Sequence, residues 1–230
     1  MKKRNLAIFA SILIFTLSGL VFAYQHKKNQ VTKQAPATKT SDTIEYDYQA
    51  YAGDLSLVGP GGNAIDTIPG KEDLKLFAIP VPGILSRSGQ PTLAGFEWLK
   101  KNGWKSVVDF REDMEKENPY AIDSKLPGFD NLGLNFLSLI IKDGGNFKKE
   151  QADQFLKFVT SPENQPVHIH CAAGIGRTGV ATALYRYSVQ GWSMNKAIEE
   201  SSLFTKIISK SQRDWLQKWA KDNLPGSYAR

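Results

Sequence analysis

A glycine-rich turn between a predicted strand and a predicted helix constrains this chain more than any other segment. Val167–His170 has the length and residue types of a short buried strand, and Thr178–Gln190 is typical of a helix. Between them, Gly174 and Gly176 permit backbone conformations that are closed to other residues. Successive N–H groups can therefore point into one concavity, and the helix that starts near Arg177 adds the positive end of its dipole. The pattern predicts an anion-binding turn.

The same turn carries the groups needed for nucleophilic attack on phosphorus. Cys171 is the only cysteine of the chain, which excludes an internal disulfide and a cysteine-rich metal site. Electropositive surroundings favour its thiolate, which is the reactive form of the side chain. Arg177 presents a planar fork that matches two phosphate oxygens. A thiolate held beneath a bound phosphate is positioned for in-line attack.

This segment resembles the active-site loop of the protein tyrosine phosphatase superfamily, whose signature is His-Cys, five residues, Arg, then Ser or Thr. The resemblance implies that Cys171 is the nucleophile and that the Thr178 hydroxyl stabilises the departing thiolate. His170 is implied to orient the loop and to lower the pKa of the cysteine. The residues implied to bind the substrate phosphate are Ala172, Ala173, Gly174, Ile175, Gly176 and Arg177. The alternative is a buried structural cysteine beside a turn.

The superfamily also requires a general acid that protonates the leaving oxygen, and Asp143 is the candidate. It lies in the Gly-rich segment Lys142–Phe147, after a predicted strand and before a predicted helix. This placement resembles the acid loop of small dual-specificity phosphatases, although the Trp-Pro-Asp triplet of conventional tyrosine phosphatases is missing. The alternative is that Asp143 only forms a turn. Glu150 and Asp153 are weaker candidates because they fall on the following helix.

Strands and helices alternate along most of the chain. The alternation predicts a three-layer α/β domain with a central, mainly parallel sheet of four or five strands flanked by helices. The predicted strands are Leu76–Ile79, Ile84–Arg87, Ser106–Phe110, Asn135–Ile140 and Val167–His170. The predicted helices run from Thr92 to Gly103 and over Phe147–Thr160, Thr178–Gln190, Ser193–Ser202 and Ser209–Asn223.

Two further segments resemble compact dual-specificity-like phosphatases. They are Gly83–Pro91 and Val107–Arg111, and in that family such segments build the sheet and its loops. The resemblance implies that Arg87, Asp109 and Arg111 form ion pairs of the scaffold.

The N-terminus has the pattern of an export or anchor signal. Lys2–Arg4 precedes an apolar run, Leu6–Ala23, that is long enough as a helix to span the hydrocarbon core of a bilayer. Residues 1–24 are therefore a cleaved signal peptide or a single-span membrane anchor, and the length of the run together with Lys27–Lys28 favours the anchor. A buried N-terminal helix of a soluble protein fits less well, since the run is apolar on every face.

The distribution of charge bears on partners and location. The net charge is +6, but the positive excess lies in residues 1–39, which contain no Asp or Glu. The rest of the chain is close to neutral, so the bulk charge gives no argument for nucleic-acid binding.

Residues 25–51 are expected to form a flexible linker and residues 52–230 the phosphatase domain. The leading positive charges favour an extracytoplasmic location in the periplasm or cell envelope. The oligomeric state stays open.

The variable positions of the loop bear on the substrate. Superfamily members that act on highly phosphorylated inositols often place lysines between Cys and Arg, whereas this loop has only Ala, Gly and Ile there. The resemblance therefore favours a metal-independent phosphatase of the tyrosine or dual-specificity type, without a cofactor, that acts through a phosphocysteine intermediate. The expected substrate is phosphotyrosine in protein, with phosphoserine or phosphothreonine as further substrates. The alternatives are hydrolysis of a small phosphate ester, such as an inositol phosphate or a lipid head group, and a non-catalytic phosphate-binding module. A rhodanese-type sulfur transferase is disfavoured by the His before Cys171 and the Arg-Thr pair after the loop.

Overall fold

The computed structural model describes residues 72–112, 127–203 and 208–229, all within one compact unit. The expectations for residues 1–24 and 25–51, including the N-terminal hydrophobic helix, lie outside these ranges. Within them, no helix is both long enough and apolar enough to traverse a bilayer.

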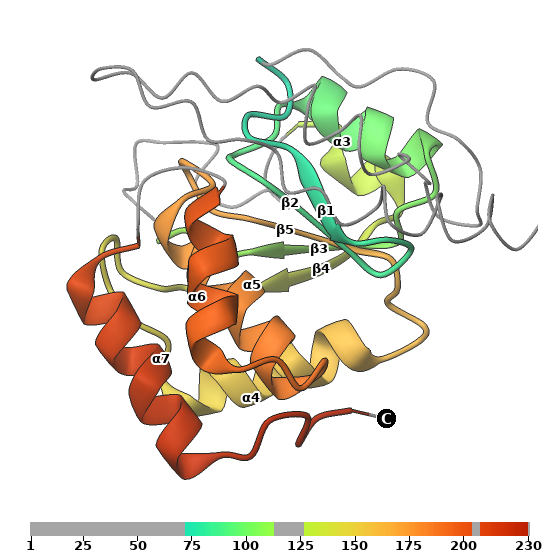
Figure 1. Cartoon of the computed structure of the whole chain (residues 1–230). Helices are drawn as coiled ribbons and strands as arrows, with labels where there is room; N and C mark the ends of the chain where they lie inside the picture. The colour runs from blue at the N-terminus through green and yellow to red at the C-terminus, as the bar shows by residue number, and fades with distance from the viewer. Residues whose placement is uncertain (1–71, 113–126, 204–207, 230) are drawn as a thin grey trace, which may run out of the picture. The chain divides into compact units, whose positions relative to one another are not determined.

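A five-stranded mixed sheet forms the centre of the described domain (Figure 1). The strands are β1 (Ala78–Val81), β2 (Leu85–Ser88), β3 (Ser106–Asp109), β4 (Asn135–Ser138) and β5 (Val167–His170). Their spatial order is β1-β2-β5-β3-β4, in which β2, β5, β3 and β4 run parallel and β1 runs antiparallel to β2. The predicted, mainly parallel sheet is thereby confirmed, with β5 at its middle.

The largest error in the predicted strands concerns β1. The prediction ended this strand before Pro80, but the strand includes Pro80 and continues to Val81. A proline lacks the N–H that a central strand needs, yet it is tolerated at an edge or beside an irregularity. Both conditions hold here, because β1 is the edge strand and its register against β2 shifts between Ala78 and Val81.

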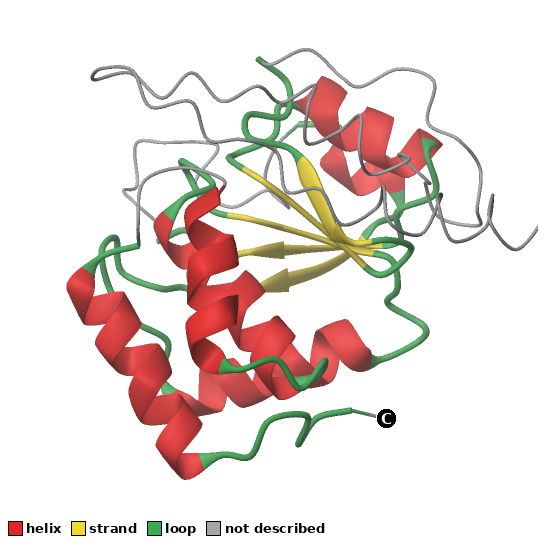
Figure 2. Ribbon diagram, viewed as in Figure 1, coloured by secondary structure: helices red, strands yellow, loops and turns green. Residues whose placement is uncertain are grey.

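Helices cover both faces of the sheet, which gives the predicted three layers (Figure 2). The helices are α3 (Leu93–Lys101), α4 (Lys149–Thr160), α5 (Gly176–Ser188), α6 (Met194–Leu203) and α7 (Lys210–Asp222), with a short 3-10 helix, η3 (Phe129–Leu132). On one face, Phe96 of α3 and Phe129 of η3 pack with Val107 of β3. The neighbouring Val108 points to the opposite face and joins the core beneath α4 and α5, since side chains alternate along a strand.

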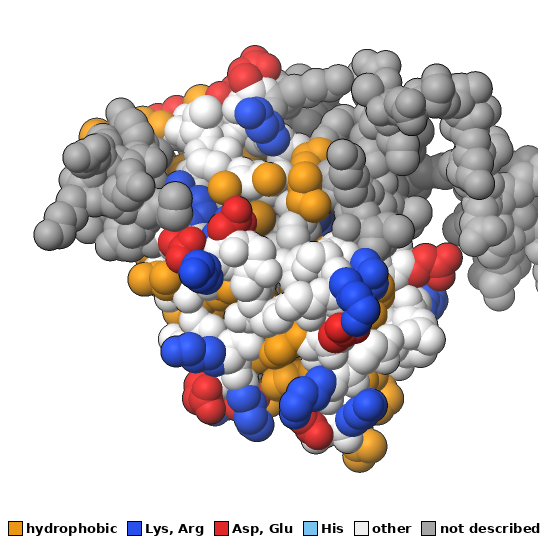
Figure 3. All heavy atoms as spheres, turned by 90° about the vertical axis from the view of Figure 1, so that its left-hand side faces the viewer, with side chains coloured by type: hydrophobic (Ala, Val, Ile, Leu, Met, Phe, Trp, Pro, Cys, Tyr) orange, Lys and Arg blue, Asp and Glu red, His pale blue; other side chains and the backbone are white. Residues whose placement is uncertain are grey.

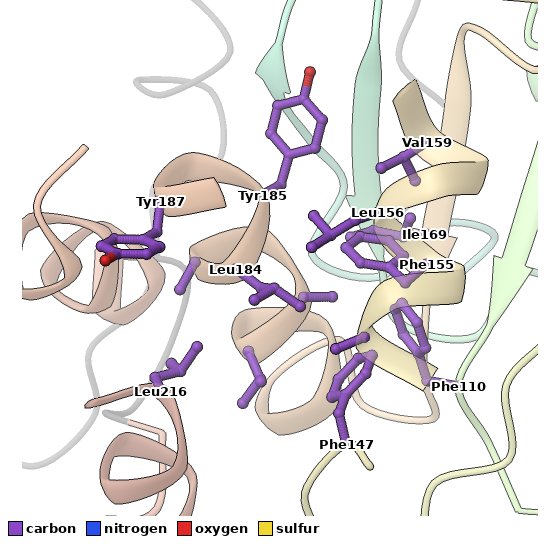
Figure 4. Packing of buried hydrophobic residues seen from close by; sticks show 14 of the residues in the cluster. Phe110, Phe147, Phe155, Leu156, Val159, Ile169, Leu184, Tyr185, Tyr187 and Leu216 are labelled. Carbon is purple, nitrogen blue, oxygen red and sulfur yellow. The ribbon is translucent and has the colours of Figure 1, made fainter. Parts of the chain in front are cut away.

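The larger core lies between the sheet and helices α4, α5 and α7 (Figure 4). Phe110, Phe147 and Phe155 form a group of aromatic rings, in which the centroids of Phe110 and Phe147 are 5.3 Å apart. Helix α5 is buried along its whole length from Arg177 to Ser188. Because packing fixes α5 on all sides, it also fixes the loop from which the helix begins.

The first turn of α5 differs from the prediction in a way that matters for the site. The helix begins at Gly176 rather than at Thr178, so Arg177 and Thr178 both lie in its first turn. The first four N–H groups of a helix have no partner within it. Donors from this turn are therefore available to groups in front of the helix.

Charged side chains on the surface are mixed in sign. On the face shown in Figure 3, Lys and Arg are interspersed with Asp and Glu. On α7, for example, Lys210 pairs with Asp214 and Lys218 with Asp222, each one helical turn apart. Such exposed pairs contribute little to stability.

Candidate active site

The candidate site lies at the carboxyl end of β5, where the chain turns into α5. We call residues Cys171–Arg177 the phosphate loop. In open α/β sheets, ligands bind outside the carboxyl ends of the parallel strands, and β5 is the central one. Cys171 is 2% exposed, whereas Ala172 and Ala173 are exposed. The thiol therefore lies at the floor of the loop and the two alanines at its rim.

Gly174 is the position where the loop cannot carry a side chain. Its φ of +74° lies in the left-handed region, which favours glycine. A Cβ built there would lie 2.5 Å from the amide nitrogen of Gly89 and 2.7 Å from the carbonyl carbon of Ser88. The loop thus packs backbone against backbone on the segment that follows β2.

Residues after and within β2 also hold the loop from outside. The buried Arg87 donates from Nη2 to the Gly174 carbonyl oxygen at 2.5 Å and from Nη1 to the Thr182 hydroxyl of α5 at 3.3 Å. The backbone N–H of Gln90 donates to the carbonyl oxygen of Ala172 at 3.0 Å. The resemblance implies that Arg87 belongs to the scaffold, and these bonds place its guanidinium against the backbone of the phosphate loop.

The surroundings of Cys171 favour its thiolate. Burial alone would raise the pKa of the thiol, but the hydroxyl and the backbone N–H of Thr178, the charge of Arg177 and the backbone N–H of Gly174 together bring that pKa below its ordinary value. Among the described residues the Thr178 hydroxyl oxygen is buried and forms no hydrogen bond of normal geometry, so it is available to a thiolate at Cys171. These surroundings are the electropositive setting that the sequence predicts for a reactive cysteine.

His170 precedes Cys171 and is completely buried. Its Nδ1 lies 3.4 Å from the carbonyl oxygen of Cys171 and 3.8 Å from Oδ1 of Asp109. Asp109 in turn forms a two-pronged ion pair with Arg111, with 3.0 Å from Nε to Oδ1 and 2.8 Å from Nη2 to Oδ2. The predicted scaffold ion pair is confirmed for Asp109 and Arg111. The position of His170 between this pair and the loop backbone is suited to orienting the loop.

Arg177 connects the phosphate loop to the two segments that follow β3 and β4 at the same end of the sheet. Its Nη1 donates to the carbonyl oxygens of Phe110, just after β3, and of Ile141, after β4, at 3.3 and 3.1 Å. Its Nη2 lies 3.1 Å from Oδ1 of Asp143. The guanidinium is 6% exposed and is therefore held in place before any ligand binds.

Asp143 is the acidic residue that the structure brings to the phosphate loop. Its side chain is 83% exposed, apart from the contact with Arg177, and its backbone N–H donates to the carboxylate of Glu112 at 3.0 Å. Asp153, one of the two weaker candidates, pairs instead with Lys149 on α4. The role of Glu112 was missed because no local pattern links it to a loop so far along the chain.

The described residues show no group of three or more His, Cys, Asp or Glu side chains that could hold a metal ion. The groups gathered at the site are instead a thiol, a guanidinium, a carboxylate and backbone N–H donors. This arrangement can bind a tetrahedral anion and offer it a nucleophile and an acid.

Comparisons with known proteins agree with this geometry. A model of the family described as DSP-PTPase phosphatase fused to NAD+ kinase matches residues 81–218. The probable chloroplastic NAD kinase 2 of Oryza sativa subsp. japonica is 30% identical over 104 residues, which are 45% of this chain and 10% of the rice protein. The putative tyrosine-protein phosphatase OCA1 of Mycosarcoma maydis is 29% identical over 120 residues, which are 51% of this chain and 73% of that protein.

A solved structure shares the fold. The catalytic core of the PP-IP phosphatase SIW14 from S. cerevisiae has a TM-score of 0.53 at 22% identity, over 66% of this chain and 94% of that one. The family match covers more than half of the chain and includes the phosphate loop and Asp143. The chain therefore belongs to the family described as DSP-PTPase phosphatase fused to NAD+ kinase, whose members are cysteine-dependent phosphatases of the tyrosine-phosphatase type.

Proposed function

We propose that the protein hydrolyses phosphate monoesters through a phosphocysteine intermediate on Cys171. One observation carries this proposal: Cys171 is buried in the turn that leads into the first turn of α5, and Arg177 of that turn lies 3.1 Å from the carboxylate of Asp143. The lowered pKa of the Cys171 thiol agrees with this arrangement. A structural cysteine would need neither an electropositive setting nor a carboxylate within reach of the same guanidinium.

In the first step, the thiolate attacks phosphorus and the ester oxygen leaves. The N–H groups of the phosphate loop and the fork of Arg177 bind the phosphate oxygens and stabilise the charge that develops on them. As the phosphate takes over Nη2 of Arg177, the carboxyl group of Asp143 is released from that nitrogen. Once free of the guanidinium, the Asp143 carboxylate takes up a proton from solvent and donates it to the leaving oxygen, and the phosphoryl group remains on Cys171.

In the second step, water attacks the phosphocysteine and the sulfur leaves as a thiolate. Asp143, now ionised, accepts a proton from this water, which restores its acid form. The Thr178 hydroxyl and the N–H groups that lower the pKa of Cys171 stabilise the leaving thiolate for the same reason. The products are inorganic phosphate and the regenerated enzyme.

For the substrate we propose phosphotyrosine in protein. The phosphate loop provides one cation, Arg177 of the signature, because the variable positions before it are occupied by Ala172, Ala173, Ile175 and Gly176. A loop with a single cation is matched to one phosphate group rather than to several. The name of the Mycosarcoma maydis relative, a putative tyrosine-protein phosphatase, points in the same direction. The alternative is a small phosphate ester as substrate, which a panel of phosphorylated compounds distinguishes from phosphotyrosine.

We also propose that residues 1–24 direct the domain out of the cytoplasm and anchor it to the membrane. The support is the sequence pattern alone: a basic start, a long apolar run, and lysines that follow it. Fractionation of cells that express the full chain tests this directly. Recovery of the protein in a cytoplasmic soluble fraction would contradict it.

Turnover of p-nitrophenyl phosphate by the full chain tests the mechanism. We expect activity in the presence of EDTA, and we expect Cys171→Ser to abolish turnover while vanadate still binds. Asp143→Ala should slow phenyl phosphate, a poor leaving group, about 10²-fold or more, and p-nitrophenyl phosphate much less. A fully active Cys171→Ser variant, or equal losses on both esters in Asp143→Ala, would contradict the assigned roles.

A panel of phosphopeptides, inositol phosphates and phospholipids tests the substrate class. We expect the highest kcat/KM on phosphotyrosine peptides. A higher value on an inositol phosphate or a phospholipid would move the substrate to the small esters. Binding of phosphopeptides without any turnover by the unmutated protein would identify a non-catalytic binding module.

A further inference from the structure

The loop that carries Asp143 is attached to the last helix of the domain. We call Lys142–Phe147 the acid loop. The side-chain amide of Asn146 donates from Nδ2 to the Ser211 hydroxyl in the first turn of α7 at 2.9 Å. The ring of Phe147 packs against Trp215 one turn further on, with centroids 5.8 Å apart. Helix α7 thus braces the acid loop with a polar and an apolar contact on one face.

Gln212, between these two contacts, reaches both loops of the site. Its side chain is 2% exposed, and its Nε2 donates to the carbonyl oxygen of Gly145 in the acid loop at 3.4 Å. The same amide lies against the phosphate loop, because a Cβ on Gly176 would be 3.0 Å from Nε2 and 3.3 Å from Oε1. One carboxamide therefore lies between the loop of the acid and the loop of the nucleophile.

The oxygen of the Gln212 side chain makes a different contact from the nitrogen. Oε1 of Gln212 accepts from the backbone N–H of Ser209, and the Ser209 hydroxyl accepts from the N–H of Gln212, which forms a capping box at the start of α7. The oxygen of the side chain thus holds the helix end, and the nitrogen holds the acid loop. The two tasks can be separated by substitution, because glutamate can accept in the capping box but its carboxylate cannot donate to Gly145.

We propose that Gln212 is a positioning residue that keeps the carboxyl group of Asp143 at the distance from the phosphate loop that proton donation requires. This inference rests on the proposed role of Asp143 as the general acid. A shift of about 1 Å in a catalytic group can cost about 10²-fold in rate. Loss of the Gln212 contact should therefore cost part of the contribution of the acid without touching the nucleophile.

The experiment compares phenyl phosphate with p-nitrophenyl phosphate as substrates of full-chain variants. Gln212→Met removes both the cap and the donor, and Ser209→Ala weakens only the cap. Gln212→Glu keeps the acceptor of the cap, removes the donor and adds a negative charge beside the phosphate loop; the charge acts on the phosphate of both substrates, so it largely cancels in the ratio of their kcat values. We expect both Gln212 variants to lower the ratio of kcat on phenyl phosphate to kcat on p-nitrophenyl phosphate about tenfold. Ser209→Ala should leave that ratio unchanged. In an Asp143→Ala background, Gln212→Met should have no further effect on the ratio.

The outcomes separate this inference from the proposed function. If Asp143→Ala changes the ratio but neither Gln212 variant does, the role of Gln212 is wrong while that of Asp143 stands. A fall of the ratio in Ser209→Ala, in step with a lower melting temperature, would reduce Gln212 to a structural role and overturn the inference. If Asp143→Ala leaves the ratio unchanged, the assignment of the acid fails, and that of Gln212 fails with it.

Discussion

Substitution of Gly174 by alanine probes the shape of the phosphate loop most sharply. Two separate penalties arise there. A left-handed backbone conformation costs a residue with a Cβ about 1–2 kcal/mol. In addition, the new Cβ would lie 2.5 Å from the backbone nitrogen of Gly89, where optimal contact needs about 3.5 Å. Backbone meets backbone here, so the loop must shift by roughly 1 Å.

Gly83 provides a matched control for the first penalty. Its φ is +71°, close to the +74° of Gly174, but a Cβ at Gly83 would meet nothing within 4 Å. Gly83→Ala should therefore lower the free energy of unfolding by about 1–2 kcal/mol and the melting temperature by about 2–8 °C, with unchanged kcat/KM. Gly174→Ala should lose more stability than this and about 10²-fold in kcat/KM, because the loop moves relative to the sulfur.

Thermal denaturation and turnover of p-nitrophenyl phosphate measure both effects on the same protein samples. The informative quantity is the difference between the two alanine variants, which isolates the contact with Gly89. Equal losses of stability in the two variants, together with full activity of Gly174→Ala, would refute the reasoning. The loop would then not be fixed by its contact with the segment after β2.

Two further predictions concern the groups around the sulfur. Thr178→Val removes a hydroxyl that lowers the pKa of Cys171, so that pKa should rise and the acidic limb of the pH profile of kcat/KM should move to higher pH; a limb that stays in place would show that the hydroxyl does not act on the thiol. Arg177→Lys should weaken vanadate binding at least tenfold, because an ammonium group cannot form the two-pronged contact, and isothermal titration measures the loss; wild-type affinity in this variant would remove the guanidinium from phosphate binding.

The sequence predicted the layers, the mainly parallel sheet and the turn between β5 and α5 because these depend on local patterns. Alternating strand and helix segments imply a parallel sheet, and Gly174 and Gly176 between such segments imply a turn that exposes N–H groups. The Pro80 error shows where local patterns fail. Whether a proline fits in a strand depends on whether that strand is at the edge of the sheet, and only the packing decides this.

Contacts between distant segments could not be predicted from the sequence for the same reason. Arg87 supports Gly174, Glu112 binds the backbone of Asp143, and Gln212 lies between two loops. A Ser and a Gln three residues apart are a visible capping-box pattern, but nothing in that pattern shows which loop the amide will meet.

The most direct measurement is the detection of phosphate on Cys171 during turnover. A rapid acid quench of the full chain with p-nitrophenyl phosphate, followed by peptide mass analysis, would capture the intermediate. We predict one phosphoryl group on the peptide that contains Cys171, formed and consumed at rates that match turnover. Steady turnover in which this peptide never carries phosphate would contradict the account.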